Sequence, residues 1–262
     1  MFSGGAGSWA AAKRVIAEHG SKRVILLFAD TLIEDADLYR FLKDAEKNLG
    51  VAITRIADGR TPWQVFEHER FIGNSRVDPC SKILKRELLD RWRNKNLDPT
   101  NSVIYVGLGW YEPDRVERLL SRMAETPWTY RTPMAEGELL DPEEVLQWME
   151  REGIKRPALY EEGFSHNNCG GFCVKAGQAH FALLLKKRRA YYLFNESEEQ
   201  RLRAQGINGA ILTDRRNKKR VPMTLKQFRI RLEGDENAFD ASDVGGCSCA
   251  LDTGPTLDNS VK

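Results

Sequence analysis

The sequence has little net charge, few cysteines and no long apolar run. Its 40 basic and 38 acidic side chains leave a net charge of +2 over 262 residues, so the overall charge draws the chain neither to nucleic acid nor to a membrane surface. Without an apolar run of transmembrane length or a signal-peptide pattern, we expect a cytoplasmic protein with no membrane contact. Five cysteines in such a chain disfavour a disulfide framework and favour metal or redox chemistry, or simply buried thiols.

The glycine-rich loop SGGAGS, residues 3–8, runs directly into a helical stretch that ends at Gly20. Glycines allow positive φ and let backbone N–H groups turn onto an anion, while the helix adds its positive N-terminal end. The loop is neither a Walker loop nor a G-x-G-x-x-G fingerprint. It is interpreted either as a phosphate cradle or as a structural turn before a helix. The candidate phosphate ligands are Ser3, Gly4, Gly5, Gly7 and Ser8.

Helical and strand-like segments alternate over the next sixty residues. The apolar run KRVILLFAD, residues 22–30, is typical of a buried parallel strand. A second short strand at residues 51–59 predicts an α/β fold, with a parallel sheet flanked by helices on both faces. Because ligands bind at the carboxyl ends of parallel strands, we expect Asp30 and Thr31 to meet a nucleotide held by the first loop. The alternative is that Asp30 only caps the next helix.

Two further stretches carry charged or nucleophilic side chains at predicted helix starts. Cys80 follows a proline at a helix start, where the helix dipole lowers the pKa of a thiol, and Lys85 adds positive charge near it. Further along, Gly107 precedes Glu112 and Arg115, so that Arg115 can hold a phosphate while Glu112 orients it. The plain alternatives are a buried cysteine beside solvated lysines, and an ordinary surface ion pair three residues apart.

The stretch at residues 163–181 holds His166, Cys169 and Cys173 among several glycines. Soft ligands at short spacing suit an iron–sulfur cluster or zinc. The remaining interpretation is that the cysteines are small buried hydrophobes. Lys175 is expected on the helix that follows, where it can face a substrate anion.

These stretches resemble, in order, the motifs of the PP-loop ATP pyrophosphatases. The loop at residues 3–8 resembles the family's SGGxxS signature, and residues 28–35 resemble its second-strand motif, with Leu32 where a glycine is common. The Glu-x-x-Arg element at Glu112 and Arg115 resembles that of PP-loop proteins in general. The Cys80-x₄-Lys85 segment and the later cysteine pair resemble the branch of PAPS and APS reductases, including versions found in phage genomes. The resemblance covers about residues 1–190.

The resemblance implies an adenine nucleotide alpha hydrolase-like fold that binds ATP or an adenylyl sulfonucleotide, with Mg²⁺. It implies sulfur transfer or sulfonucleotide reduction, with a thiol reductant or a sulfur-donor protein as partner. A [4Fe–4S] cluster would be held by Cys80, Cys169 and Cys173, with His166 or a tail cysteine as the fourth ligand. A structural zinc on the same cysteines and His166 is the alternative. Cys80, Lys85, Arg115 and Cys249 are the candidate catalytic residues.

Besides Leu32, the chain departs from this family in three places. Ser81 stands where the proximal element usually has a second cysteine, and the reductases' Glu-Cys-Gly-Leu/Ile-His tail is absent. Cys247 and Cys249 can supply a thiol nucleophile, a resolving pair or cluster ligands in its place. The family's loop follows a buried strand, whereas here Met1 and Phe2 alone precede it, so we expect either a misplaced start codon or a missing central strand.

The C-terminal third is predicted to be helical and basic. Its basic blocks at residues 186–189 and 215–220, near Tyr191, Tyr192 and Phe194, are interpreted either as a nucleic-acid contact or as solvated faces. The expected parts are a nucleotide-binding α/β domain at 1–160, a cysteine-containing helical region at 161–232 and a flexible tail at 233–262. The competing functions are a nucleotide- or nucleic-acid-binding protein without turnover and a zinc-stabilised interaction domain.

Overall fold

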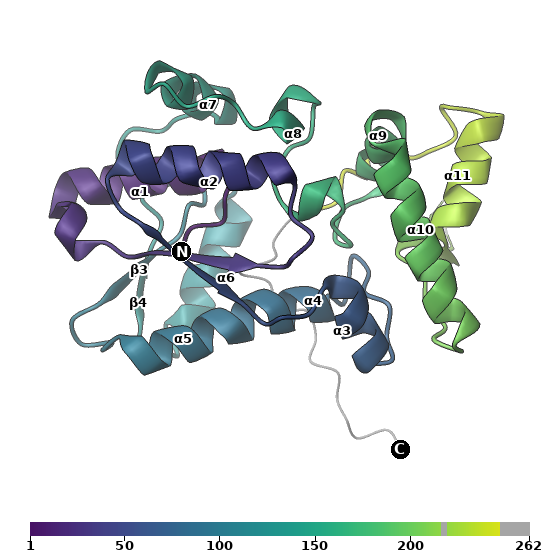
Figure 1. Cartoon of the computed structure of the whole chain (residues 1–262), viewed down its shortest axis with the longest axis horizontal. Helices are drawn as coiled ribbons and strands as arrows, with labels where there is room; N and C mark the ends of the chain where they lie inside the picture. Colours follow the sequence, from purple (N-terminus) through teal and green to yellow (C-terminus); the bar gives the residue numbers. More distant parts are fainter. Residues whose placement is uncertain (216–218, 247–262) are drawn as a thin grey trace. The chain divides into compact units, whose positions relative to one another are not determined.

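The computed structural model describes residues 1–215 and 219–246, and the chain forms two compact units (Figure 1). Unit 1 combines residues 1–58 with 87–170, and unit 2 combines residues 59–86 with the chain from 171 onward. The sequence predicts consecutive parts at 1–160, 161–232 and 233–262. The division into these three functional parts stays a prediction. Each compact unit of the structure combines two stretches that are far apart in the chain.

Unit 1 is an α/β unit whose short strands pair in parallel. Strand β1 (Leu26–Asp30) pairs with β2 (Ile53–Ala57), and β3 (Val103–Tyr105) pairs with β4 (Thr129–Arg131). The helices of unit 1 are α1 (Ala6–His19), α2 (Ala36–Leu49), α5 (Leu88–Asn96), α6 (Pro113–Met123), α7 (Pro142–Arg151) and α8 (Ala158–Glu161). The prediction of short parallel strands flanked by helices is confirmed.

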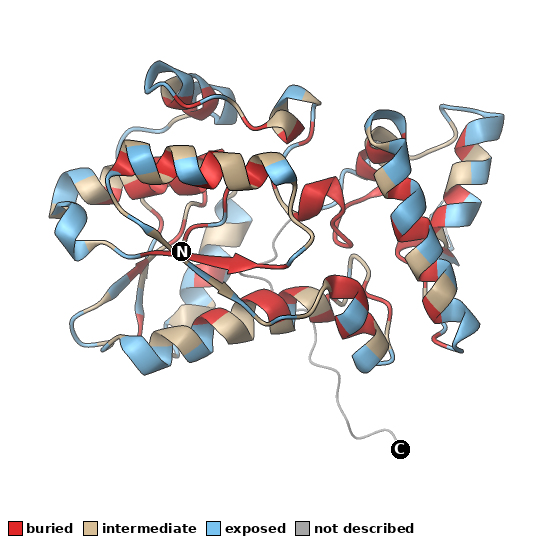
Figure 2. Ribbon diagram, in the orientation of Figure 1, coloured by how far each residue is buried: buried red, intermediate tan, exposed pale blue. Residues whose placement is uncertain are grey.

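Strand β1 is buried on both faces, which explains its uninterrupted apolar run (Figure 2). Leu26 and Phe28 belong to the core that α1, α2 and α7 share, whereas Leu27 and Ala29 pack with Leu89 of α5. Alternate side chains of one strand therefore serve two cores.

Helix ends in unit 1 follow local signals in the sequence. Helix α1 ends at Gly20, which has φ = 80°, and α2 ends at Gly50 in the left-handed conformation. The N-cap of α2 is Asp35, whose carboxylate accepts a hydrogen bond from the Asp37 N–H at 2.8 Å. Asp30 is therefore not the cap of this helix, and its burial at the end of β1 has another cause.

Unit 2 is mainly helical. Its helices are α3 (Pro62–His68), α4 (Pro79–Ser81), α9 (Gln178–Lys187), α10 (Arg189–Ala204) and α11 (Leu225–Gly234), with the π-helical turn Lys82–Glu87 running into unit 1. Strands β5 (Leu212–Asp214) and β6 (Val221–Met223) pair antiparallel, and they flank the second basic block. Lys175 lies in the turn before α9, so the expectation that it sits on the helix is wrong.

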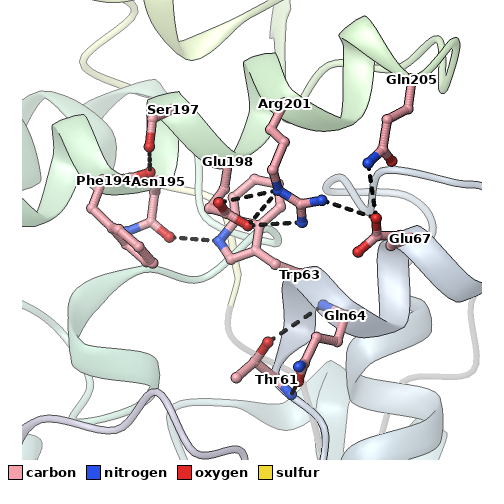
Figure 3. Close-up of polar contacts among 10 residues, drawn as sticks. All are labelled: Thr61, Trp63, Gln64, Glu67, Phe194, Asn195, Ser197, Glu198, Arg201 and Gln205. Atoms are coloured by element: carbon pink, nitrogen blue, oxygen red, sulfur yellow. Dashed lines mark hydrogen bonds and ion pairs between the residues drawn. The ribbon is translucent and has the colours of Figure 1, made fainter.

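Helix α3 is held against α10, which explains why residues 59–86 belong to unit 2 (Figure 3). The indole N–H of Trp63 donates to Asn195 Oδ1 at 2.9 Å, and both side chains are buried. Further out, Glu67 accepts hydrogen bonds from Arg201 and from Gln205, each at 2.9 Å.

Across the described ranges 1–215 and 219–246, none of the helices is long and apolar enough to cross a membrane.

Candidate functional site

The glycine-rich loop forms the N-terminal end of α1. Gly5 is the N-cap, and because glycine has no side chain, the residue offers no capping oxygen of its own to the first-turn N–H groups. The Tyr160 hydroxyl accepts a hydrogen bond from the Ala6 N–H at 3.2 Å. Gly4 has φ = 79°, which favours glycine, and Ser8 Oγ donates to the Gly5 carbonyl at 2.7 Å. The loop thus presents a helix N-terminus that a tyrosine hydroxyl partly satisfies.

The loop lies directly against the turn that follows β3. A Cβ atom added to Gly107 would lie 2.6 Å from the Gly7 carbonyl oxygen and 2.9 Å from the Ser8 Cα. A Cβ atom added to Gly7 would lie 3.1 Å from the Gly107 carbonyl oxygen. Position 107 therefore accepts glycine alone without a backbone shift, and this contact fixes the loop at the carboxyl end of β3.

Asp30 ends β1 in a closed network of polar groups. Its side chain is fully buried, and its Oδ1 accepts hydrogen bonds from the Leu32 N–H at 2.7 Å and from the Tyr39 hydroxyl at 3.0 Å. Arg55 forms an ion pair with the same carboxylate. Desolvation, and then the charge of Asp30, raise the pKa of Tyr39 to about 12. Asp30 therefore shapes the turn after β1 through contacts within the protein.

The turn after β1 contains an unusual backbone conformation. Leu32 has φ = 62°, the left-handed region that side chains with a Cβ rarely adopt. Cys169, which also has a positive φ of 54°, lies next to this turn. Its N–H donates to Glu34, and its Sγ lies 4.0 Å from the Thr31 hydroxyl. Two non-glycine residues with positive φ thus lie at one place, a pattern that clusters at functional sites.

Asn167, two residues before Cys169, bonds the glycine-rich loop. The side chain is 1% exposed, and its Nδ2 donates to the Gly4 carbonyl at 3.0 Å, while its buried Oδ1 has no hydrogen-bond partner among the described residues. A buried acceptor left without a donor costs about 1–3 kcal/mol, so a ligand hydroxyl or N–H placed there would be stabilised. Sequence reasoning missed Asn167 and Tyr160, although Asn167 lies beside the predicted ligands His166 and Cys169.

Glu112 and Arg115 lie at the start of α6, after the turn that contacts the loop. Glu112 accepts a hydrogen bond from the Gly109 N–H at 3.2 Å and forms an ion pair with Arg115. Arg115 is half-buried. The guanidinium is therefore held by a carboxylate that is itself bonded to the glycine turn.

Cys80 lies in unit 2, and the expectation of a low thiol pKa is wrong. Burial, and next the charge of Asp78, raise the pKa of the Cys80 thiol to about 12, while the positive charge of Lys85 opposes the rise. The helix that begins here has only three residues before the π-helical turn that carries Lys85, so its dipole is weak. The Asp78 carboxylate also lies close to two cations, with Oδ2 3.6 Å from Arg86 Nη1 and Oδ1 3.9 Å from Lys175 Nζ.

The predicted metal ligands are divided between the two units. His166 and Cys169 belong to unit 1, Cys80 and Cys173 belong to unit 2, and Cys249 lies outside the described residues. Within the described part of the chain, no group of three or more histidine, cysteine or acidic side chains is arranged to hold a metal ion. The iron–sulfur cluster and the structural zinc ion both stay predictions.

No protein-family model matches the sequence, and no curated protein matches it. The family resemblance therefore rests on the sequence motifs alone.

Proposed function

We propose that the chain binds an adenine nucleotide at residues 3–8 of unit 1 and acts on it as a PP-loop enzyme, in sulfur transfer or sulfonucleotide reduction. One observation carries the proposal. The N-terminus of the 14-residue helix α1 meets the turn that follows β3, and next to it Asn167 bonds the Gly4 carbonyl while its buried Oδ1 has no hydrogen-bond partner among the described residues. Parallel α/β folds bind nucleotides at this edge of the sheet, with phosphate at a helix N-terminus.

The phosphate groups would lie at the N-terminal end of α1. A phosphate oxygen can replace the Tyr160 hydroxyl as the acceptor for the Ala6 N–H, because both oxygens accept hydrogen bonds and the helix N-terminus favours the negatively charged one. Arg115 supplies the positive charge that a polyphosphate needs, and Mg²⁺ would accompany ATP. In unit 2, Lys85 is the candidate for neutralising a second oxyanion.

The nucleoside would lie toward Asn167. Its unpartnered Oδ1 can accept a hydrogen bond from a ribose hydroxyl, while its Nδ2 keeps the bond to the Gly4 carbonyl. Thr31 and Glu34 contact Cys169, two residues after Asn167 in the same segment.

A second candidate is nucleotide binding without turnover. The raised pKa of the Cys80 thiol supports it, because a protonated thiol is a poor nucleophile at neutral pH. Contact with a nucleic acid has separate support in unit 2, where the exposed Phe194 ring stacks on Tyr191 with centroids 6.4 Å apart, next to the basic residues 186–189. Tyr192 takes no part in that surface, because it is buried and donates to the Leu225 carbonyl.

Calorimetric titration with ATP, AMP and adenosine tests the nucleotide site. We expect ATP to bind tightest, and Arg115→Gln to weaken ATP binding about tenfold while leaving adenosine binding unchanged. Arg118→Gln is the matched control, because Arg118 lies one turn further on the exposed side of α6. Absence of nucleotide binding, or an equal loss in the control, would contradict the proposal.

Turnover is tested separately, by release of AMP and pyrophosphate from ATP in the presence of sulfide and candidate acceptors. Reduction of PAPS or APS is followed by sulfite release with a thiol reductant. Binding without either product supports the second candidate. Iron, sulfide and zinc analysis after anaerobic purification then decides between a cluster, a structural zinc and a metal-free chain.

A further inference from the structure

Two aromatic side chains are exposed in the turn between β3 and α6 of unit 1. Trp110 is 42% exposed and Tyr111 is 41% exposed, and their rings meet edge to face with centroids 6.2 Å apart. The indole N–H of Trp110 donates to the Leu140 carbonyl at 3.2 Å. The Tyr111 ring lies over Gly109, where an added Cβ atom would be 2.4 Å from a ring carbon. Both rings are therefore held in place while much of their surface stays open to solvent.

The segment that follows β4 lies beside these rings. It is tied to Trp110 through the Leu140 carbonyl, and its neighbour Leu139 is 53% exposed. Burial raises the pKa of Tyr111, the charge of Arg115 opposes the rise, and the charge of Asp141 adds to it. Asp141 is thus close enough to the Tyr111 hydroxyl for its charge to be felt there.

Arg14 of α1 holds this segment by its main chain. Its guanidinium donates to the carbonyls of Pro133, Glu136 and Glu138 at 2.8, 3.1 and 2.6 Å. These bonds use main-chain oxygens, and both glutamate residues are exposed. The segment is therefore fixed by contacts that leave the two carboxylates facing water.

The two turns carry negative charge around the rings. Residues 106–112 and 132–141 contain no basic residue, and their acids are Glu112, Glu136, Glu138 and Asp141. Arg115 pairs with Glu112. Among the described residues, no ion pair neutralises the other three, and the cation of Arg14 offsets only part of their charge. We call Trp110, Tyr111, Leu139 and these three acids, Glu136, Glu138 and Asp141, the acidic–aromatic surface.

We propose that the acidic–aromatic surface docks a basic segment of a partner protein, with an arginine or lysine side chain against the Trp110 and Tyr111 rings. A cation over an indole face is attracted by the negative charge of that face. A guanidinium can stack there while it donates hydrogen bonds to neighbouring carboxylates, and Glu138 and Asp141 supply such acceptors. Leu139 covers part of the aliphatic stem of the same side chain.

The charge of this surface distinguishes a basic protein segment from other partners. The carboxylates would repel the phosphates of a nucleic acid or of an anionic lipid. A purely apolar partner would bury the same carboxylates without pairing them, at a cost in free energy. A basic segment pairs them, and the held rings provide the aromatic anchor that interface centres commonly have. The six residues of the surface are separate from those proposed to hold the nucleotide.

Fluorescence anisotropy with a labelled peptide, Gly-Arg-Lys-Arg-Leu-Arg-Lys, tests the surface on the full chain at about 0.15 M salt. We expect saturable binding that Trp110→Ala weakens about tenfold, and that Trp110→Phe, which keeps a ring, weakens about threefold at most. Phe194→Ala is the control, because Phe194 is a 51% exposed aromatic residue in unit 2, and it should leave binding unchanged. An unchanged Tm shows that each variant is folded.

The carboxylates are tested with the double variant Glu136→Gln/Glu138→Gln. Its control is Glu125→Gln/Glu236→Gln, which removes the same charge at exposed glutamates outside the surface. We expect the first variant to weaken peptide binding about tenfold and to reduce its salt dependence, and the control to change binding by less than about twofold. Bound peptide should slow hydrogen exchange at residues 106–112 and 132–141.

Absence of saturable binding, equal losses in the control variants, or protection by the peptide outside the two turns would overturn the proposal. Tighter binding of an acidic peptide or of a single-stranded oligonucleotide to the same turns would do so as well. A chain that is dimeric in solution and becomes monomeric in Trp110→Ala would also overturn it, because a second copy would then be the occupant.

Discussion

Gly107 and Gly7 approach so closely that a Cβ atom at position 107 would lie 2.6 Å from the Gly7 carbonyl oxygen. We predict that Gly107→Ala forces the turn after β3 away from the loop. Overpacking of this kind costs about 1–3 kcal/mol, so the free energy of unfolding falls by that amount in urea denaturation followed by tryptophan fluorescence. Nucleotide affinity falls with it, because the loop loses its support.

The control for this substitution is Gly234→Ala. A Cβ atom at Gly234, the last residue of α11, would meet nothing within 4 Å. Alanine is the better helix former, so we expect an unchanged or slightly higher unfolding free energy. Equal destabilisation by both alanines would show that the contact between Gly7 and Gly107 does not hold the loop.

Leu32 has positive φ and is 41% exposed, so its side chain gains little from burial. A left-handed conformation costs a non-glycine residue about 1–2 kcal/mol, and asparagine tolerates it better. We predict that Leu32→Asn raises the unfolding free energy by about 0.5–1 kcal/mol in urea denaturation. Leu139→Asn is the control at an exposed leucine without positive φ, and it should bring no gain. A loss of stability at position 32 would mean that the leucine side chain supports the turn.

The Cys80 thiol has a pKa raised from 9.0 to about 12 in the folded chain. A raised pKa means that folding favours the protonated thiol. The contribution of the thiol to the free energy of unfolding is therefore complete below pH 9 and is lost as the pH rises toward 12. We predict that the unfolding free energy of the native sequence falls more steeply above pH 9 than that of Cys80→Ala. The difference in slope is at most about 1.4 kcal/mol per pH unit.

Thiol alkylation gives a second measurement for Cys80. At pH 8 we expect iodoacetamide to modify Cys80 slowly in the folded chain and quickly in urea, as measured by mass spectrometry of the peptide. Fast modification of Cys80 in the folded chain would contradict the raised pKa. So would unfolding free energies of the native sequence and of Cys80→Ala that change with pH in parallel.

Glu199 ties three elements of unit 2 together. The side chain is fully buried, and it accepts hydrogen bonds from the Ile211 N–H at 3.0 Å and from the Leu225 N–H at 2.6 Å. Burial raises the pKa of Glu199 to about 7, against the opposite effect of these two bonds. Folding thus favours the protonated form of Glu199. The contribution of this form to the free energy of unfolding is complete below pH 4.5 and is lost as the pH rises through 7.

We therefore predict that the stability of the native sequence, relative to Glu199→Gln, decreases between pH 4.5 and pH 7 and is constant above. Urea denaturation at several pH values measures the difference. Glu236→Gln, at an exposed glutamate, is the control and should follow the native sequence at every pH. A difference that does not change with pH would show that Glu199 titrates in the folded chain as in the unfolded one.

Several local features were readable from the sequence, because short-range signals produce them. Gly20 and Gly50 end helices α1 and α2, and Pro62 begins α3, as their residue types indicate. The apolar run at residues 22–30 contains a parallel strand, β1, that is buried on both faces. Such features depend on backbone preferences and on the period of apolar residues, which a single sequence contains.

Other features depend on contacts between residues that are far apart in the chain. Residues 59–86 belong to unit 2 because Trp63 bonds Asn195, 132 positions away. Asn167 reaches the Gly4 carbonyl across 163 positions, which no local pattern announces. The sequence placed Cys80 at a helix start and so predicted a lowered thiol pKa, whereas desolvation raises it. Burial is set by the whole fold, and in a low-dielectric interior it outweighs the dipole of a three-residue helix.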